Sequence, residues 1–358
     1  MQAIRFGVDL AKRVFHAHGV DASDAVVVAR SLRRHQVLTF FAAQPPALIG
    51  MEACGSAHHW ARELTKLGHT VKLMPAAYVK RYVPRNKNDA RDAEGCCEAV
   101  SRPVMRFVPI KTVEQQCQRA LQRTRDLLIG QRTRTSNAIR GQLYELGLIA
   151  SKGSTGIKAL LERIERDDTA IPALLLAALR PLARQWRELD GQIKGLDKEV
   201  LSQARAHPDA RRLMTVPNVG PITAHAAVAA LGDGRQFDRG RDVAAWVGLT
   251  RKTHDTGGKT KAIGHISRAG DRALRRLLVL GASSHLRRVR AKPGEGSAWI
   301  RGVLARRPVK VAVVAQAAKT ARIIWAVLTS GEEYRAEPNR AAHRRPGLGE
   351  ACDAPLPA

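Results

Sequence analysis

Four acidic residues in the first hundred positions are spaced so that they could share a metal ion. Asp9 ends an apolar run in GVDLAK, Glu52 follows the run ALIGM, and Asp89 and Asp92 stand three apart in KNDARDA. Residues three apart project from one face of a helix. Clustered carboxylates repel one another unless divalent cations neutralise them, and Mg²⁺ prefers oxygen ligands. Such ions can clamp both oxygens of a phosphoryl displacement, so these acids predict Mg²⁺ as the cofactor.

Each acid alone also has an ordinary structural explanation. Asp9 could be a turn residue after a strand, Glu52 could begin a helix, and the Asp89/Asp92 pair could stabilise the first turn of a helix. Their order along the chain favours the catalytic interpretation, because a strand, a later strand and a helix follow one another within one α/β region of a very basic protein.

The elements that would position these acids follow from hydrophobic periodicity and helix boundaries. We predict a helix that Asn86 or Asn88 caps and that runs to about Ser101, before Pro103. The other elements predicted for this region are strands at 3–10, Val14–Val20, Ala25–Ala29, Ala47–Met51 and Thr70–Met74, with helices at Ser31–Ala43 and Ala57–Leu67. Strands followed by alternating helices and strands predict an α/β domain with a mixed sheet at residues 1–112.

The rest of the chain is predicted to be all-α. Residues 113–206 form helices at 113–147 and 171–206, antiparallel through a bend at Gly153–Gly156. This region is either a helical connector, serving as a spacer or oligomerisation arm, or a helical subdomain packed on one core. Residues 207–330 form a second, mainly helical domain, and residues 331–358 form a disordered tail rich in Pro, Gly and Arg.

The segment LMTVPNVGPITAHAAVAAL at 213–231 has the form of a helix-hairpin-helix. In this interpretation Pro217, Val219 and Gly220 form the turn, and Gly220 permits a tight turn and a close approach. The next helix then offers free N–H groups to a phosphate, which would bind nucleic acid without reading its sequence. An ordinary helical hairpin is the alternative.

The stretch HDTGGKTK is predicted to be a flexible basic loop, and it lacks the spacing of a Walker loop. Hydroxyls at Thr256 and Ser267 lie in this basic setting, where a hydroxyl can attack a phosphodiester once its proton is removed. From these residues alone, a capping Ser and a phosphate-contacting Thr remain the simpler explanation. The basic side chains predicted to bind nucleic acid here are Lys259, Lys261, Arg268, Arg272 and Arg275.

Charge and composition narrow the partners. Lys and Arg number 60 against 32 Asp and Glu, a net charge of +28, which calls for a polyanion. Nucleic acid fits better than an anionic membrane, because the basic residues are spread along the chain. The five cysteines form no CxxC pair, and no export signal is evident, so we expect reduced thiols and a cytoplasmic protein without a membrane partner. Val309–Leu328 predicts an amphipathic helix and not a membrane span.

Several motifs together resemble one known family. They are GVDLAK, GMEACGSAHHWARELTKLGH, KNDARDAE, VPNVGPITA, WVGLT, TGGKTKAIGHISRAGDRALRRLL and VAQAAKTARIIWAVL, in this order between about residues 4 and 328. In these motifs the chain resembles the insertion-sequence-110 family of DEDD transposases, which are bridge-RNA-guided recombinases.

The resemblance implies a ribonuclease-H-like (RuvC-type) domain whose Asp9, Glu52, Asp89 and Asp92 bind Mg²⁺. It also implies a coiled-coil connector and a C-terminal domain with a nucleophilic serine that joins covalently to DNA. A structured non-coding RNA would guide a homo-oligomer, a dimer or a tetramer. The family's serine precedes the glycine of a loop like HDTGGK, and Thr256 stands there in this chain. The nucleophile is therefore expected at Thr256 by position, with Ser267 as the alternative, or this copy is impaired.

Two other functions are compatible with the residues. A junction-resolving nuclease would need the acids but no covalent hydroxyl, and it would cut DNA without rejoining it. A non-catalytic nucleic-acid-binding protein would use the same acids only as structural residues.

Overall fold

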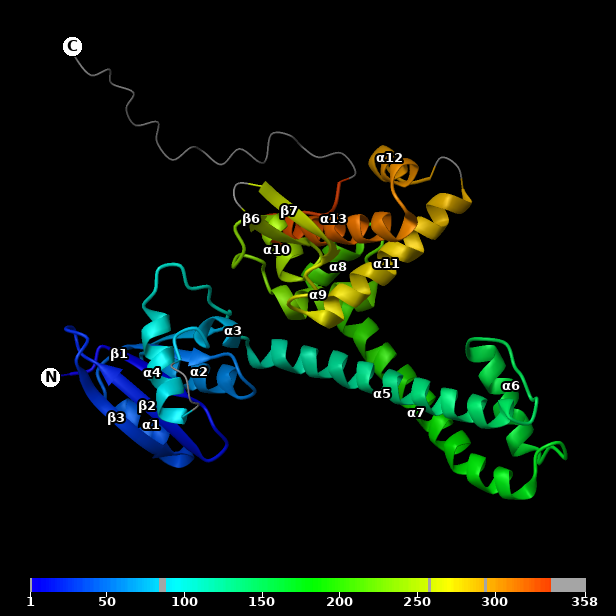
Figure 1. Ribbon diagram of the computed structural model, residues 1–358, viewed down its shortest axis with the longest axis horizontal. Helices are drawn as coiled ribbons and strands as arrows, with labels where there is room; N and C mark the ends of the chain where they lie inside the picture. The colour runs from blue at the N-terminus through cyan, green and yellow to red at the C-terminus, as the bar shows by residue number, and fades with distance from the viewer. Residues whose placement is uncertain (1, 84–87, 257–258, 293–294, 336–358) are drawn as a thin grey trace, which may run out of the picture. The chain divides into compact units, whose positions relative to one another are not determined.

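The computed structural model describes residues 2–83, 88–256, 259–292 and 295–335, and within 253–264 it describes the backbone alone. The chain divides into two compact units, Met1–Cys117 (unit 1) and Gln118–Ala358 (unit 2) (Figure 1). The three domains and the disordered tail expected from the sequence remain predictions, and the tail from residue 336 lies outside the described residues.

Unit 1 is built on a mixed five-stranded sheet with the strand order β3-β2-β1-β4-β5. The strands β1, β2 and β3 are antiparallel neighbours, whereas β1, β4 and β5 run parallel. Their bounds are Arg5–Asp9 (β1), Val14–Val20 (β2), Val26–Arg33 (β3), Leu48–Glu52 (β4) and Thr70–Met74 (β5). The predicted mixed sheet is thus confirmed, and this topology is consistent with a ribonuclease-H-like domain.

Helices cover both faces of this sheet because its side chains alternate between them. On one face, Phe6 and Val8 pack in a core with α1 (Val37–Ala42) and α2 (Ala57–Lys66). On the other face lie α4 (Asp89–Val100) and the short α3 (Ala76–Val79), which share a second core with the end of β5.

The helix predicted at Ser31–Ala43 is wrong over its first half. Strand β3 continues to Arg33, which pairs with Val14, and a short 3₁₀ helix η1 (Arg34–Gln36) precedes α1. Leu32 is buried in the sheet core. Packing of this side chain against the sheet therefore outweighs the helical periodicity that the sequence shows locally.

Two long helices, α5 (Val113–Tyr144) and α7 (Ala173–Ala206), account for the predicted helices at 113–147 and 171–206. Within unit 2, Arg125 pairs with Asp197 and Arg132 pairs with Asp190. The partner on α7 therefore moves seven residues toward the N-terminus as the arginine on α5 moves seven residues toward the C-terminus. The two helices thus run antiparallel, as predicted.

The prediction that a bend at Gly153–Gly156 alone connects the two long helices is wrong. The helix α6 (Ser154–Glu165) lies there between α5 and α7. It buries Ile157, Leu160, Leu161 and Ile164, which stand at helical spacing and form a core with α5 and α7. The backbone does turn at Gly153, where φ is +92°.

The remainder of unit 2 is mainly helical, as predicted. A core of apolar side chains joins α8, α9, α10, α11 and α13. The helices are α8 (Pro208–Met214), α9 (Pro221–Leu231), α10 (Gly240–Trp246), α11 (Arg272–Ala291), α12 (Ala298–Arg306) and α13 (Val309–Ser330).

Helix α13 is the described helix that is long and apolar enough to cross a membrane by length and composition. Half of its most apolar stretch is buried inside unit 2. Its side chains Ala317, Ala321 and Ile324 belong to the unit 2 core. Core packing therefore accounts for the apolar composition of this helix.

The flexible loop predicted around HDTGGKTK is wrong for the backbone on both sides of the glycines. Strands β6 (Arg251–Thr256) and β7 (Lys259–Ile266) form a two-stranded antiparallel hairpin there. Adjacent glycines between two runs rich in Thr, Ile and Lys are a hairpin signal, so the sequence contained the cue. Gly257 and Gly258 themselves lie outside the described residues.

Candidate active site

The alternation of side chains along two parallel strands directs two of the four acids to one face of the sheet. In β1 and β4, Gly7 and Gly50 are register partners and both face α4. Asp9 and Glu52 each follow these glycines by two positions, and they therefore project toward the same face. Both strands also end there, so the two carboxylates come from adjacent strand ends.

Helix α4 crosses this face at unusually short distance because the strands carry glycine beneath it. A Cβ added at Gly7 would lie 1.9 Å from the carbonyl oxygen of Ala93, and one at Gly50 would lie 2.7 Å from that of Cys96. Real Cβ atoms do not approach backbone so closely, so larger residues would push the helix away. The two glycines therefore set the distance between α4 and the strand ends.

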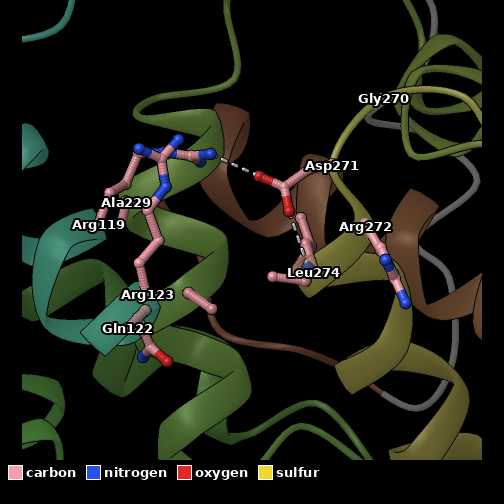
Figure 2. A pocket seen from close by; sticks show the side chains of 10 residues that line it. Arg119, Gln122, Arg123, Ala229, Gly270, Asp271, Arg272 and Leu274 are labelled. Carbon is pink, nitrogen blue, oxygen red and sulfur yellow. Dashed lines mark hydrogen bonds and ion pairs between the residues drawn. The ribbon is translucent and has the colours of Figure 1, made fainter. Parts of the chain in front are cut away.

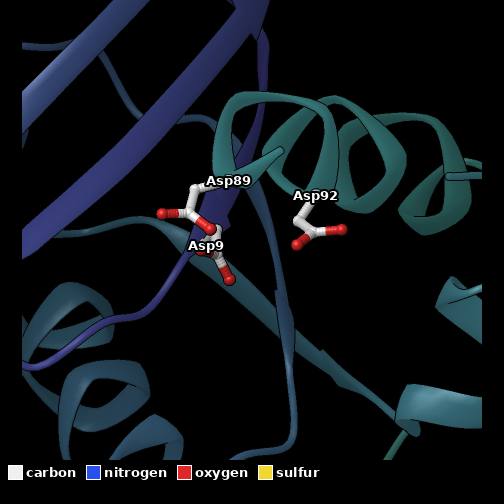
Figure 3. A group of neighbouring side chains, drawn as sticks. All are labelled: Asp9, Asp89 and Asp92. Atoms are coloured by element: carbon white, nitrogen blue, oxygen red, sulfur yellow. The ribbon is translucent and has the colours of Figure 1, made fainter. Parts of the chain in front are cut away.

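The first turn of α4 supplies the other two acids. The side chain of Asn88 accepts a hydrogen bond from the N–H of Ala90, which confirms Asn88 as the cap of this helix. Asp89 and Asp92 then share one face of the helix. One carboxylate oxygen each of Asp9, Asp89 and Asp92 lie within 4.8 Å of one another (Figure 3).

Glu52 is outside this group of three at that distance, although it faces the same way. Its backbone hydrogen-bonds to the buried thiol of Cys96 on α4, which ties the end of β4 to the helix. Its carboxylate also contributes to raising the pKa of Asp9. The structure therefore brings three of the predicted acids into one cluster and places the fourth nearby.

The repulsion among the carboxylates of the cluster exceeds the compensation that the protein provides at Asp9. The pKa of Asp9 is raised above its ordinary value by burial and then by the like charges of Asp92 and Asp89. Among the residues that the structure describes, neither Asp9 nor Asp92 forms a salt bridge. Three converging carboxylates that no described Lys or Arg pairs with suit a hard divalent cation, and so the donor set fits the metal predicted from the sequence.

The sequence reasoning missed His16 as a neighbour of the cluster. In β2 it is the register partner of Asp9, and its Nε2 lies 3.9 Å from Oδ2 of Asp89. Its Nδ1 lies 3.2 Å from the hydroxyl of Ser31 on β3. A hairpin of β1 and β2 would have predicted this neighbour, because His16 then lies beside Asp9 at the end of β1.

Comparison with known proteins places the chain in a family. A family model described as a transposase, of the IS110 DEDD type, matches residues 6–147. A second, described as the IS116/IS110/IS902 transposase family, matches residues 210–295. The chain belongs to the IS110 family of transposases. As a member of this family it is a DNA-cleaving and recombining enzyme, and DNA is its substrate.

Relatives of this transposase are similar over nearly all of its length. It is 47% identical to a putative transposase, y4pF/y4sB, of Sinorhizobium fredii, over 93% of this chain and 86% of the relative. It is 46% identical to a probable family 20 transposase of Pseudomonas aeruginosa, over 94% and 99%. It is 38% identical to the transposase for insertion sequence element IS1111A of Coxiella burnetii, over 92% and 90%.

The second matched region of this transposase begins with α8, a turn and α9. The sequence-based assignment of the tight turn to Gly220 is wrong, because Gly220 has a φ of −86° and Asn218 is the residue in the left-handed region, with φ +70°. Asn218 is fixed by a hydrogen bond that its amide donates to Thr320 and by the close packing of Gly281 on its carbonyl. Gly220 is the N-cap residue of α9, and a Cβ added there would meet no other atom within 4 Å.

The two candidate hydroxyls of the transposase lie at opposite ends of the β6–β7 hairpin. Thr256 is at the turn, opposite Lys259, whereas Ser267 follows Ile266 at the open end. Ser267 lies opposite Thr250, and with about 3.3 Å per strand residue roughly 20 Å of strand separates it from Thr256, so both cannot serve one phosphate in this conformation. The side chains of Thr256, Lys259 and Lys261 lie outside the described residues.

The predicted basic residues of this region differ in their engagement with the protein. The guanidinium of Arg275 donates to the carbonyls of Val247 and Ala269 and holds the base of the hairpin together. Arg268 is exposed and has a left-handed backbone. Arg272 is exposed in the first turn of α11.

Proposed function

We propose that this transposase cuts and rejoins DNA at insertion-element ends and target through a Mg²⁺-dependent reaction with a covalent protein–DNA intermediate. The observation that carries the metal assignment is the convergence of Asp9, Asp89 and Asp92 within 4.8 Å, with no Lys or Arg of the described residues in an ion pair with them and with His16 beside Asp89. Glu52, on the same face of the sheet, would complete the ligand set.

In this proposal the acids bind Mg²⁺ and position the scissile phosphate. The bound cation would supply charge neutralisation for the phosphate and polarisation of its oxygens. The hydroxyl oxygen of Thr256 forms a bond to phosphorus while the ester bond to the departing strand breaks, and its proton passes to a base. A DNA hydroxyl then displaces Thr256 and restores the protein. Ser267 is the alternative nucleophile.

The partners follow from charge and from the family. The net charge of +28 favours a polyanionic partner. We propose a structured non-coding RNA as guide, a homo-oligomer as the active form, and the α8–α9 hairpin as a grip on the nucleic-acid backbone through Pro217, Val219 and Gly220. Lys259, Lys261 and Arg268 would add phosphate contacts.

A single reaction tests the proposal. Purified protein, Mg²⁺, RNA transcribed from the sequence beside the gene and labelled element-end DNA are incubated and resolved under denaturing conditions. We expect a covalent protein–DNA species that disappears in Thr256→Ala and persists in Ser267→Ala, the matched control. Loss only in Ser267→Ala would reassign the nucleophile, and free nicked DNA alone would show a nuclease that does not rejoin.

The acids need their own control in the same reaction. Asp9→Asn is expected to abolish strand cleavage while DNA binding stays near that of the wild type, because the acid acts on the metal and not on the DNA grip. If Asp9→Asn lost binding together with cleavage, Asp9 would be a structural residue and the catalytic assignment would fail.

A further inference from the structure

A basic pocket in unit 2 is distinct from the acid cluster and from the hairpins. It has a volume of about 300 Å³ and lies between α5, α9 and the first turn of α11 (Figure 2). Small side chains, Ala226 and Ala229 of α9, leave room on one side, and Leu274 adds an apolar surface. The polar lining comes from Arg119, Gln122, Arg123, Asp271 and Arg272.

The one carboxylate of this lining is already satisfied by the protein. Asp271 caps α11, and its Oδ1 accepts a hydrogen bond from the N–H of Leu274 at 2.9 Å. Its Oδ2 accepts from the guanidinium of Arg119 at 2.8 Å, as the dashed line in Figure 2 marks. Burial alone would raise the pKa of Asp271, but these two partners outweigh it and lower the pKa. Asp271 is therefore ionised and neutralises Arg119.

Two further guanidiniums of the lining lack such a partner. Arg123 on α5 and Arg272 on α11 are exposed, and neither forms a hydrogen bond or ion pair with any residue that the structure describes. Three guanidiniums against one carboxylate leave the lining with a net charge of +2. An exposed arginine without a protein partner is free to bind a planar or tetrahedral oxyanion.

Gln122 adds a fixed amide to the same pocket. Its side chain is buried, and its Nε2 lies 2.8 Å from Nδ1 of the buried His225 on α9. This contact holds the amide in place between the two arginines of α5, Arg119 and Arg123, which precede and follow it on the helix. Most of the pocket lining thus comes from the helices α5, α9 and α11, with Gly270 and Asp271 just before α11.

From these charges we propose that the pocket binds one phosphodiester of the DNA substrate, with Arg123 and Arg272 as its direct ligands and Arg119 and Gln122 as the supporting wall. DNA is chosen as the source because it is the substrate of the family and the chain carries a large positive charge. The inference adds to the proposed function a phosphate site that depends on neither the metal nor the covalent step. Arg272 was predicted from the sequence to bind nucleic acid, whereas Arg119 and Arg123 were not.

The test measures how DNA binding depends on salt. Each phosphate contact that is lost lowers the slope of log affinity against log salt by about 0.9. The affinity of the full-length protein for a labelled element-end duplex is determined by anisotropy at several salt concentrations. For the double variant R123Q/R272Q we expect the slope to fall by about 1.8, and the affinity at low salt to fall about tenfold or more per arginine.

Two further variants keep the inference falsifiable. R166Q/R184Q removes two arginines that are also exposed and without a described partner, but that lie at the end of α6 and on α7, and it is expected to keep the wild-type slope. R123K/R272K retains both charges and is expected to restore the slope. An unchanged slope in R123Q/R272Q, or an equal fall in R166Q/R184Q, would overturn the pocket. So would a loss confined to binding of single-stranded RNA. A protein without cleavage but with the expected slopes would leave this site standing while the proposed function fails.

Discussion

Replacing Asp9 by Asn removes one charge from a cluster in which burial and like charges raise the pKa of Asp9, and we expect this variant to be more stable than the wild type in the absence of metal. Two unit charges 4.8 Å apart repel by about 3.5 kcal/mol at an effective dielectric of 20 and by about 0.9 kcal/mol in water. Asp9 is only half-buried, so solvent screens part of this repulsion. We expect the free energy of unfolding of unit 1 in EDTA to rise by about 1–2 kcal/mol.

Adding a divalent cation should reverse the order of stability of Asp9→Asn and the wild type. A ligand at a hundred times its dissociation constant stabilises the folded state by about 2.7 kcal/mol. The wild type should gain about this amount on addition of Mg²⁺, and Asp9→Asn should gain little because the cluster has lost one ligand. With saturating Mg²⁺ the wild type therefore becomes the more stable of the two proteins.

The assay must report on unit 1 alone, because a chain of two units need not unfold in one step. Hydrogen exchange of the amides of β1 and α4, followed by mass spectrometry with and without Mg²⁺, meets this need. The reasoning is refuted if Asp9→Asn exchanges faster than the wild type in EDTA, since Asp9 would then support the fold and not the metal.

The pH dependence follows from the raised pKa of Asp9. A carboxyl whose pKa is higher in the folded state than its ordinary value of 3.8 binds its proton more tightly in the folded state. Its stabilising contribution is complete below the ordinary pKa and is lost as the pH rises through the raised one. The advantage of Asp9→Asn in EDTA should thus be largest at neutral pH and should shrink as the pH falls toward 4. An advantage that is constant with pH would contradict a charge effect.

Further substitutions test the residues that position the acid cluster of unit 1 and the turn before α9 in unit 2. Gly7→Ala should destabilise unit 1 by about 1–3 kcal/mol because its Cβ would overlap α4. The control Gly191→Ala, in open space on α7, should stabilise unit 2 by about 0.5–1 kcal/mol. Hydrogen exchange in each unit measures both changes, and equal effects of the two substitutions would refute the role of Gly7. His16→Ala should weaken Mn²⁺ binding, measured by calorimetry, by about tenfold through loss of support for Asp89; His18→Ala on the same strand is the control, and unchanged affinity in His16→Ala would exclude that role. Asn218→Ala should destabilise unit 2 by about 1–2 kcal/mol, because Ala tolerates the left-handed turn poorly and loses the amide donated to Thr320; wild-type stability in a denaturant titration would rule this out.

The secondary structure of unit 1 could be predicted from the sequence where one local rule decided the structure. The alternation of VFHAHGV and the apolar run of TVKLM placed β2 and β5 at the observed residues. Asn88 was one of two candidate caps, and its side chain does cap α4. The acid cluster could be predicted because Asp9 ends a strand and a helix cap at Asn88 puts Asp89 and Asp92 on one face of the first helical turn.

Features that depend on distant packing could not be predicted from local patterns. Ser31–Ala43 has helical periodicity, yet pairing with β2 keeps its first residues in a strand. The place of His16 beside the acids depends on the strand order, which periodicity does not supply. Glycine is the usual left-handed residue, and the sequence therefore points to Gly220 for the turn. The hydrogen bond that Asn218 donates to Thr320 and the contact of Gly281 fix Asn218 there instead.

The register pair Gly7 and Gly50 bears on how distant members of this family should be recognised. Four acids scattered over some eighty positions recur by chance in many sequences, but acids that meet also require a smooth patch of sheet on which their helix can rest. A homologue that keeps every carboxylate and carries a bulkier residue at either glycine would have to place that helix farther from the sheet and would separate its acids. Checking for glycine at both positions would therefore distinguish intact copies of the transposase from decayed ones better than counting acids does.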